Sequence, residues 1–287
     1  MREVTGWFRV EGRDLPWRGD HRDAWQVLVS EFMLQQTPVT RVAPVWVAWI
    51  ERWPTASHLA AEPPAEALRM WGRLGYPRRA LRLHGAATAI RDDFGGAVPN
   101  TYEELRSLPG VGDYTAAAVL AFAHRRRIPV MDTNVRRVLA RLWDGLAYPT
   151  GSAPSRAERS RLDMALPPTA EGAAVLSEAL MELGALVCTP RNPRCDECPV
   201  ARHCSWHAAG RPDNQVPPNR QAPFAGSDRQ VRGRIMQLVR STPTAVAQAE
   251  IDLAWPDEAQ LRRAQRSLLS DGLLVEAAPG RFALPGE

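Results

Sequence analysis

The 287-residue sequence contains no lysine, so its 36 basic side chains other than histidine are all arginines. The N-terminal amine is then the only amine available for Schiff-base chemistry, which excludes a lysine nucleophile. The net charge of +4 is compatible with a polyanionic partner without requiring one.

The sequence also lacks long apolar runs, and none approaches the roughly 20 residues that a membrane span requires. The N-terminus, MREVTGWFRVEGRDLPWR, is charged from its second residue and has no apolar signal-peptide core. We therefore expect a cytoplasmic protein with no membrane partner. Its length suggests two domains and a third small one.

Cysteine is scarce, and all four cysteines fall in one window with the spacing C-x6-C-x2-C-x5-C: Cys188, Cys195, Cys198 and Cys204. Because disulfides are not expected in a cytosolic protein, the four thiols indicate a metal-ligand set. Zinc sites usually draw on two short-spaced pairs, whereas here only the central pair is close. The spacing favours a [4Fe–4S] cluster, with zinc as the alternative.

Strand alternation is absent through residue 210, where the periodicity is helical. Apolar residues recur at three-four spacing over residues 23–36, with Trp25 and Met33 on the expected core face. Further helical patterns punctuated by proline and glycine cover residues 44–53, 65–71, 79–91, 101–107, 114–123, 135–143 and 171–187. This part is predicted to be all-α.

Residues 211–227 hold four prolines among polar residues, a composition typical of a linker. Beyond it, three helical patterns at 230–240, 248–254 and 258–269 precede LLVEAAPGRFAL, two apolar runs around a Pro-Gly turn. Three helices and a hairpin predict a small winged-helix-like α+β domain over 228–287. Either DNA contact or a purely structural role fits this domain.

The motif LPGVG lies between two helical patterns, the first opened by Thr101-x-x-Glu104. Its glycines allow a tight turn that leaves backbone N–H groups exposed, and the next helix directs the positive end of its dipole to the same place. The turn can therefore bind a DNA phosphate without recognising the base sequence. An ordinary helical hairpin is the alternative. The alanine-rich second helix favours a DNA-binding helix-hairpin-helix, with DNA contacts at Leu108, Gly110, Val111 and Gly112.

Six segments resemble MutY-type adenine DNA glycosylases, in the same order along the chain: SEFMLQQTPV, WGRLGYPRRALRLH, LPGVGDYTAAAV, MDTNVRRVLAR, EALMELGALVC and the cysteine loop. The resemblance covers about residues 15–204. It implies a two-lobed helix-hairpin-helix glycosylase core over 1–210, with a [4Fe–4S] loop at 188–204. A six-helix lobe would span about 22–131, and a cluster lobe would combine 1–21 with 132–210.

Members of that family remove adenine mispaired with 8-oxoguanine or guanine during base excision repair of double-stranded DNA. The resemblance implies that Glu31 is the general acid and Asp132 the second carboxylate. Adenine leaves poorly until N7 is protonated, and its loss leaves positive charge on the sugar. A protonated Glu31 would supply the proton, and an ionised Asp132 would stabilise the oxocarbenium or trap it covalently. For Asp132, a helix N-cap is the structural alternative.

Other positions match family residues around the flipped adenine or the second carboxylate: Tyr114, Asn134, Glu178 and Arg18. Gln36 matches a residue that wedges into the duplex, which base flipping requires. The family has two adjacent tyrosines in the segment that matches WGRLGYPRRALRLH, and the second is replaced here by Pro77. The wedge therefore differs here or is supplied by Tyr76 and Gln36. Each of these residues also has a structural alternative.

Tyr114 stands where the related endonuclease III has its catalytic lysine, two residues after LPGVG. With no lysine anywhere in the chain, we predict a monofunctional glycosylase without a lyase step. We expect a monomer acting on DNA that contains a mispaired adenine, at the nucleoid if the source is bacterial.

The usual MutY-type enzyme carries a larger NUDIX-like domain that recognises 8-oxoguanine, whereas about 60 residues follow the linker here. The sequence therefore leaves the preferred opposite base open. Alternatives on the same scaffold are a thymine-mismatch glycosylase and an endonuclease III-like enzyme. A non-catalytic, redox-sensing DNA-binding regulator is the alternative from another class.

Overall fold

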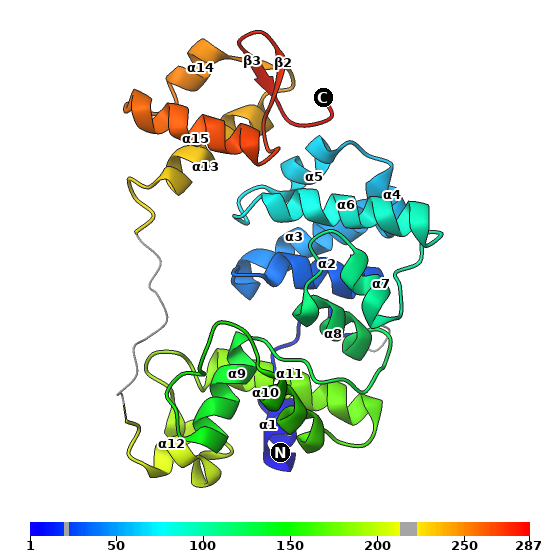
Figure 1. The fold of residues 1–287 in the computed structure, drawn as a ribbon, viewed down its shortest axis with the longest axis vertical. Coiled ribbons are helices and arrows are strands. Elements are labelled where there is room, and N and C mark those ends of the chain that lie inside the picture. Colours follow the sequence, from blue (N-terminus) through cyan, green and yellow to red (C-terminus); the bar gives the residue numbers. More distant parts are fainter. Residues whose placement is uncertain (20–22, 213–222) are drawn as a thin grey trace. The chain divides into compact units, whose positions relative to one another are not determined.

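The computed structural model describes residues 1–19, 23–212 and 223–287. Helices dominate it, and the strands in this part of the chain all lie near the C-terminus (Figure 1). The predicted all-α core with a small α+β C-terminal part is confirmed. Ten residues of the predicted linker, 213–222, lie outside the described residues. None of the described helices is both long and apolar enough to cross a membrane.

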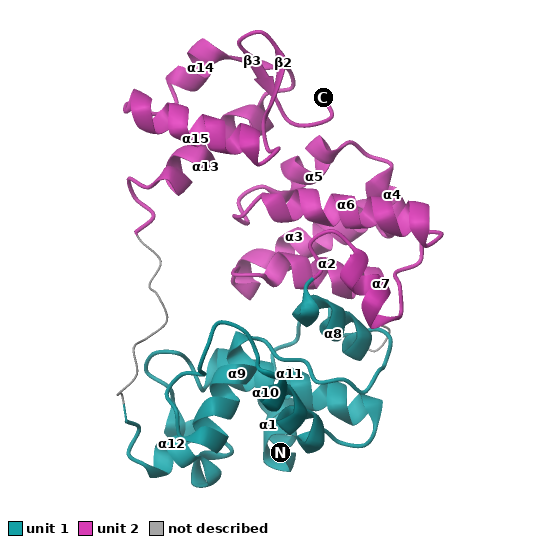
Figure 2. Cartoon of the chain, in the orientation of Figure 1, with its two compact units in different colours: residues 1–24, 112–220 teal, residues 25–111, 221–287 magenta. Residues whose placement is uncertain are grey.

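Contacts group the chain into two compact units (Figure 2). The first unit combines residues 1–24 with 112–220, and the second combines 25–111 with 221–287. Each unit is therefore assembled from segments far apart in the sequence.

Helix α11 (Ala170–Leu186) forms the centre of the first unit, and α1, α8 and α9 contact it. Thr169 caps α11 by accepting the Gly172 N–H at 3.2 Å, and leucines and alanines cover its buried face. The other elements are α1 (Arg2–Glu11), α8 (Asp113–Phe122), α9 (Thr133–Leu139), a π-helical turn (Ala140–Asp144), α10 (Arg156–Ala165), two 3-10 turns (Cys195–Glu197 and Ala201–His203) and α12 (Ser205–Ala208).

Periodicity did not predict helices α1 and α10, because each buries little. Val4 is the buried residue of α1, and Leu162 is that of α10. Helix α10 instead begins with a capping box, in which Ser155 and Glu158 exchange bonds of 2.6 and 3.1 Å. Local capping therefore defines this helix more clearly than its hydrophobic pattern does.

The second unit packs around three edge-to-face indoles. The ring of Trp49 lies 4.6 Å from that of Trp53 and 5.8 Å from that of Trp71. The predicted core residues Trp25 and Met33 are buried, as expected. Its helices are α2 (Ala24–Leu34), α3 (Val39–Arg52), α4 (Ala56–Ala60), α5 (Pro64–Trp71), α6 (Arg78–Asp93) and α7 (Tyr102–Ser107).

Residues 228–287 form three helices and an antiparallel sheet of strand order β1-β3-β2, in agreement with the winged-helix prediction. Val246 pairs with Phe282, and Val275 pairs with Ala283. Strand β1 has only two residues, too few to show a period in the sequence. The elements are α13 (Asp228–Ser241), β1 (Val246–Ala247), α14 (Gln248–Asp252), α15 (Glu258–Ser270), β2 (Val275–Ala278) and β3 (Arg281–Ala283).

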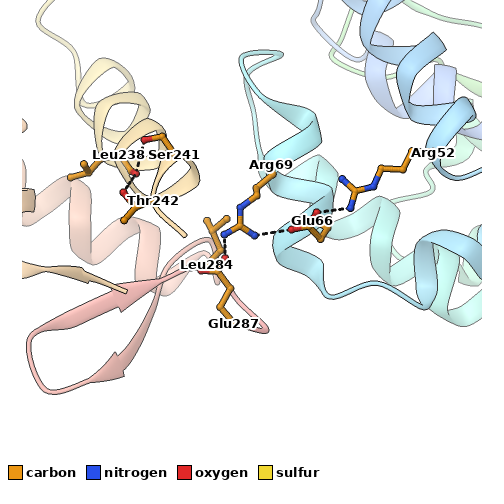
Figure 3. A network of polar contacts seen from close by, with 8 residues as sticks. All are labelled: Arg52, Glu66, Arg69, Leu238, Ser241, Thr242, Leu284 and Glu287. Carbon is orange, nitrogen blue, oxygen red and sulfur yellow. Dashed lines mark hydrogen bonds and ion pairs between the residues drawn. The ribbon is translucent and has the colours of Figure 1, made fainter. Parts of the chain in front are cut away.

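This C-terminal domain docks on helix α5 of the same unit through an arginine-carboxylate chain (Figure 3). The Arg69 guanidinium donates to both Glu66 and Glu287, and Arg52 binds the other oxygen of Glu66 at 2.5 Å. Arg240 of α13 also donates to the backbone carbonyl of Gly72. The domain is thus attached beside the loop of residues 72–77, which joins α5 to α6.

Candidate functional site

Asp132 is the N-cap of α9, as its structural interpretation predicted. One carboxylate oxygen accepts the Val135 N–H at 2.6 Å, and the other accepts the Asn134 side-chain amide at 3.0 Å. Desolvation by the surrounding protein raises the pKa of Asp132 above its ordinary value, while these two donors and the charge of Arg137 act to lower it. Capping therefore also fixes the direction in which this carboxylate points.

A chain of hydrogen bonds joins Asp132 to the first cysteine of the metal-ligand set. Asn134 accepts from Arg137 at 2.8 Å, and the same guanidinium donates to the backbone carbonyl of Cys188 at 2.8 Å and to that of Gly184 at 2.7 Å. A Cβ on Gly184 would lie 2.7 Å from the Cβ of Asn134, so only glycine lets α9 and α11 approach this closely.

The four cysteines form a partly buried set beside the core of the first unit. Arg141, in the π-helical turn, donates to the Cys188 sulfur at 3.3 Å, and its own carbonyl accepts the Cys204 thiol at 3.4 Å. Burial, together with the other three thiols, raises the pKa of Cys198 to about 11.

These thiols fit an iron–sulfur cluster, because bound metal cations would relieve the repulsion between neighbouring thiolates. A mononuclear zinc site gathers its ligands around one ion. Within the described ranges, no three histidine, cysteine or acidic side chains are grouped closely enough to hold a single ion. A polynuclear cluster would be held by Cys188, Cys195, Cys198 and Cys204.

Glu31 lies in the last turn of α2 and is 5% exposed, so it is not a solvent-facing helix residue. Gln36 follows that helix and Tyr76 precedes α6; both are exposed and have left-handed backbones, with φ of 55° and 47°. Pro77, which stands in place of the family's second tyrosine, is the N-cap of α6.

The LPGVG turn connects α7 to α8, as predicted. Thr101 caps α7 by accepting the Glu104 N–H at 3.3 Å, but the Glu104 carboxylate binds the Thr101 hydroxyl rather than completing a capping box. Leu108 and Val111 are buried, so any contact of theirs with a phosphate is made by the backbone. Gly110 has φ of 82°, and a Cβ there would lie 2.8 Å from Arg82 and 2.9 Å from Phe32.

Tyr114 lies in the first turn of α8, and Glu178 is buried in α11. Arg18, predicted near the site, binds Glu182 at 2.9 Å together with Arg13 at 2.6 Å. Burial alone would raise the pKa of Glu182, but the two arginines lower it overall. Sequence reasoning missed Glu182, although a second acid four residues after Glu178 in an apolar helix is a usable signal.

The predicted site residues are divided between the two units. Asp132, Asn134, Tyr114, Glu178, Arg18, Gly112 and the four cysteines belong to the first unit. The second unit contains Glu31, Gln36, Tyr76, Leu108, Gly110 and Val111. Asp132 and Asn134 are joined to the cysteine loop through Arg137.

Two family models match the chain. Residues 29–154 match the HhH-GPD superfamily of base excision DNA repair proteins, and residues 188–204 match the iron–sulfur binding domain of endonuclease III. The second match covers the cysteine window from its first to its last thiol. The prediction of a [4Fe–4S] cofactor is confirmed, and the zinc alternative is set aside.

Relatives and solved structures agree with these matches. An adenine DNA glycosylase of Mycolicibacterium smegmatis is 52% identical over 99% of this chain and 96% of that protein. A thermostable thymine-DNA glycosylase shares 26% identity with a TM-score of 0.66, over 72% of this chain and 94% of its own. A non-covalent endonuclease III–DNA complex, at 24% identity and a TM-score of 0.61 over 73% and 94%, supports the fold alone.

Gly110 and Gly112 form a matched pair for testing the hairpin. Gly110→Ala is expected to lower the free energy of unfolding by about 2–4 kcal/mol, because it places a side chain on a residue with a left-handed backbone and brings its Cβ into a clash with Arg82. Gly112→Ala should leave it nearly unchanged, since φ there is −95° and the space is open. Urea unfolding followed by circular dichroism measures both, and equal losses would contradict this geometry.

Arg137→Met is expected to destabilise the first unit by about 3 kcal/mol, because it leaves one buried and two partly buried acceptors without their donor. The purified variant should also retain less iron than the unaltered protein. Arg161→Met is the control: its ion pair with Asp144 is half-exposed and is expected to contribute under about 1 kcal/mol. Equal stability and iron content in the two variants would refute the role given to Arg137.

Proposed function

The chain belongs to the adenine DNA glycosylase family, and we propose that it excises adenine mispaired with 8-oxoguanine or guanine from double-stranded DNA. The observation that carries this proposal is 52% identity to a curated adenine DNA glycosylase over nearly the whole length of both chains. The buried Glu31 and the hydrogen-bonded Asp132 supply the carboxylate pair that the reaction needs. Regulation by DNA binding alone would not require such a pair.

In the proposed reaction, Glu31 protonates N7 of the flipped adenine, and the bond between N9 and C1′ breaks. Ionised Asp132 stabilises the positive charge on the sugar, either electrostatically or by a transient bond to C1′. A water molecule then adds to C1′, which yields free adenine and an abasic site. Hydrogen bonds from Val135 and Asn134 favour the ionised form of Asp132 and so oppose the effect of desolvation on its pKa.

The iron–sulfur cluster, bound to the four cysteines, is proposed to hold the loop of residues 188–204 in shape. Arg137 then connects that loop to Asn134, and so to Asp132, without any redox step. Tyr114, Glu178 and Arg18 are proposed to support the adenine pocket, and Gly112 the phosphate contact of the hairpin. Gln36 and Tyr76 are proposed to supply the wedge that fills the space left by the flipped base.

The C-terminal domain is proposed to be a structural extension of the core rather than a second DNA reader. Residues 228–287 contain eight arginines and eight acidic residues, so the domain has no net charge to attract phosphates. Residues 1–210 would then form the working glycosylase, as a monomer at the DNA of the cytoplasm or nucleoid.

A single-turnover assay with four duplexes tests the assignment. Adenine opposite 8-oxoguanine and adenine opposite guanine are expected to be cleaved at least about 100-fold faster than thymine opposite guanine or an oxidised pyrimidine. The physical reason is that only adenine presents N7 to Glu31. Faster release of thymine or of the oxidised pyrimidine would transfer the assignment to another activity of the same scaffold.

Borohydride trapping tests the absence of a lyase step. With no lysine in the chain, incubation with abasic DNA and borohydride is expected to give no more covalent adduct than its N-terminal amine can form. Acetylating that amine should remove the remaining signal. Efficient trapping that survives acetylation would show that another group forms the imine.

The pH dependence of excision follows from Asp132. A carboxyl whose pKa is raised is ionised only above that higher pKa, so activity should fall with decreasing pH at values above the ordinary aspartate range. Asn134→Leu removes a donor to the carboxylate and should raise the pKa further. The acidic limb of the rate profile is expected to shift to higher pH in this variant; an unchanged limb would argue that Asp132 is not the titrating group.

A further inference from the structure

Arg79, in the first turn of α6, is a buried arginine that the proposed chemistry does not use. It is 5% exposed, and one of its terminal nitrogens donates to the carbonyls of Phe32 at 2.8 Å, Met33 at 3.0 Å and Gln35. The other terminal nitrogen donates to the Thr37 hydroxyl at 2.8 Å and to the Gly75 carbonyl at 3.1 Å.

These acceptors come from two segments that are about 40 residues apart in the sequence. Phe32 and Met33 belong to the C-terminal end of α2, where helix carbonyls lack partners and a cation is favourable. Gly75 belongs to the loop before α6. Arg79 therefore fastens the end of the helix that bears Glu31 to the loop that bears Tyr76.

The carbonyls of Gln35 and Gly75 each lie next to a residue with an unusual backbone conformation. Each belongs to the peptide group immediately before a residue with a left-handed backbone, Gln36 with φ of 55° and Tyr76 with φ of 47°. Such a conformation costs free energy in a residue with a side chain, so it persists only where neighbouring bonds impose it. One guanidinium supplies a bond to both peptide groups.

The aromatic side chains beside Arg79 complete the arrangement. Its guanidinium lies 5.5 Å from the ring centre of Tyr76 and 5.1 Å from that of Trp71, whose indole N–H also donates to Gly75 at 2.9 Å. No carboxylate in the described part of the chain forms an ion pair with Arg79. Burial lowers its pKa to about 10, which still leaves it charged at neutral pH.

We propose that Arg79 is a positioning residue that holds Gln36 and Tyr76 in one fixed pair, so that both side chains enter the duplex together when adenine is flipped. This inference rests on the proposed function, which gives those two side chains the role of the wedge. Arg79 touches neither the base nor the sugar in this account. Its effect is confined to opening the base pair.

Arginine is suited to this role by its planar fork, which reaches several acceptors at once. Lysine would keep the charge but offers a single ammonium that cannot span the Gln35 and Gly75 carbonyls together. Arg79→Lys therefore removes the forked hydrogen bonds while it keeps the positive charge, so it tests the two contributions separately. Arg240→Lys is the matched control, because Arg240 donates to the same loop at Gly72 but to neither peptide group next to the wedge.

The test compares two substrates in single-turnover reactions: adenine paired opposite guanine, and adenine opposite an abasic spacer, where no pair has to be opened. We expect Arg79→Lys to slow release of the paired adenine about 10-fold and release of the unpaired adenine less than about twofold. Arg240→Lys should change neither rate, and thermal melting confirms that each variant is folded. Equal slowing on both substrates would overturn the inference, since it would indicate a general structural defect.

A double-mutant cycle with Gln36→Ala/Tyr76→Ala identifies the route of the effect. If Arg79 acts through the wedge, adding Arg79→Lys to this pair should change the rate less than about twofold, and additive losses would overturn the inference. If the pair itself does not slow release of paired adenine, the wedge assignment and the inference both fail. If the unaltered protein releases adenine from neither substrate, the proposed function fails instead.

Discussion

Guanidinium groups that bind several backbone carbonyls at once hold both parts of the candidate site. Arg137 joins the carbonyls of Gly184 and Cys188 to Asn134, and so to Asp132. Arg79 performs the same task in the other unit, at the end of α2. A chain without lysine has only arginine for such contacts, and arginine suits them because its donors form a rigid fork.

Asp132 shows that a structural role and a proposed catalytic role are compatible in one residue. Capping α9 determines where its two oxygens point, and the cost of holding a desolvated carboxylate is offset by donors from Val135 and Asn134. The cluster loop stabilises this arrangement indirectly, through the Cys188 carbonyl. Loss of the cluster is thus expected to disturb the position of Asp132 through these hydrogen bonds, without any electron transfer.

Much of this could be predicted from the sequence, because the informative features are local. Long amphipathic helices, the LPGVG turn, the cysteine window and the Pro-Gly hairpin each have a pattern within a few residues. Helices α1 and α10 had none, since each buries a single apolar residue. The bonds of Arg79 and Arg137 were unpredictable for another reason: their acceptors are mainly backbone carbonyls, which leave no mark on residue type.

The role of Glu31 as general acid is the central claim, and its Gln variant tests it most directly. Single-turnover release of adenine opposite guanine and equilibrium binding of the same duplex would be measured for Glu31→Gln and the unaltered protein. The account predicts a rate at least about 10³-fold lower with binding unchanged within about threefold. Adenine release at a near-normal rate, or loss of binding in step with activity, would contradict it.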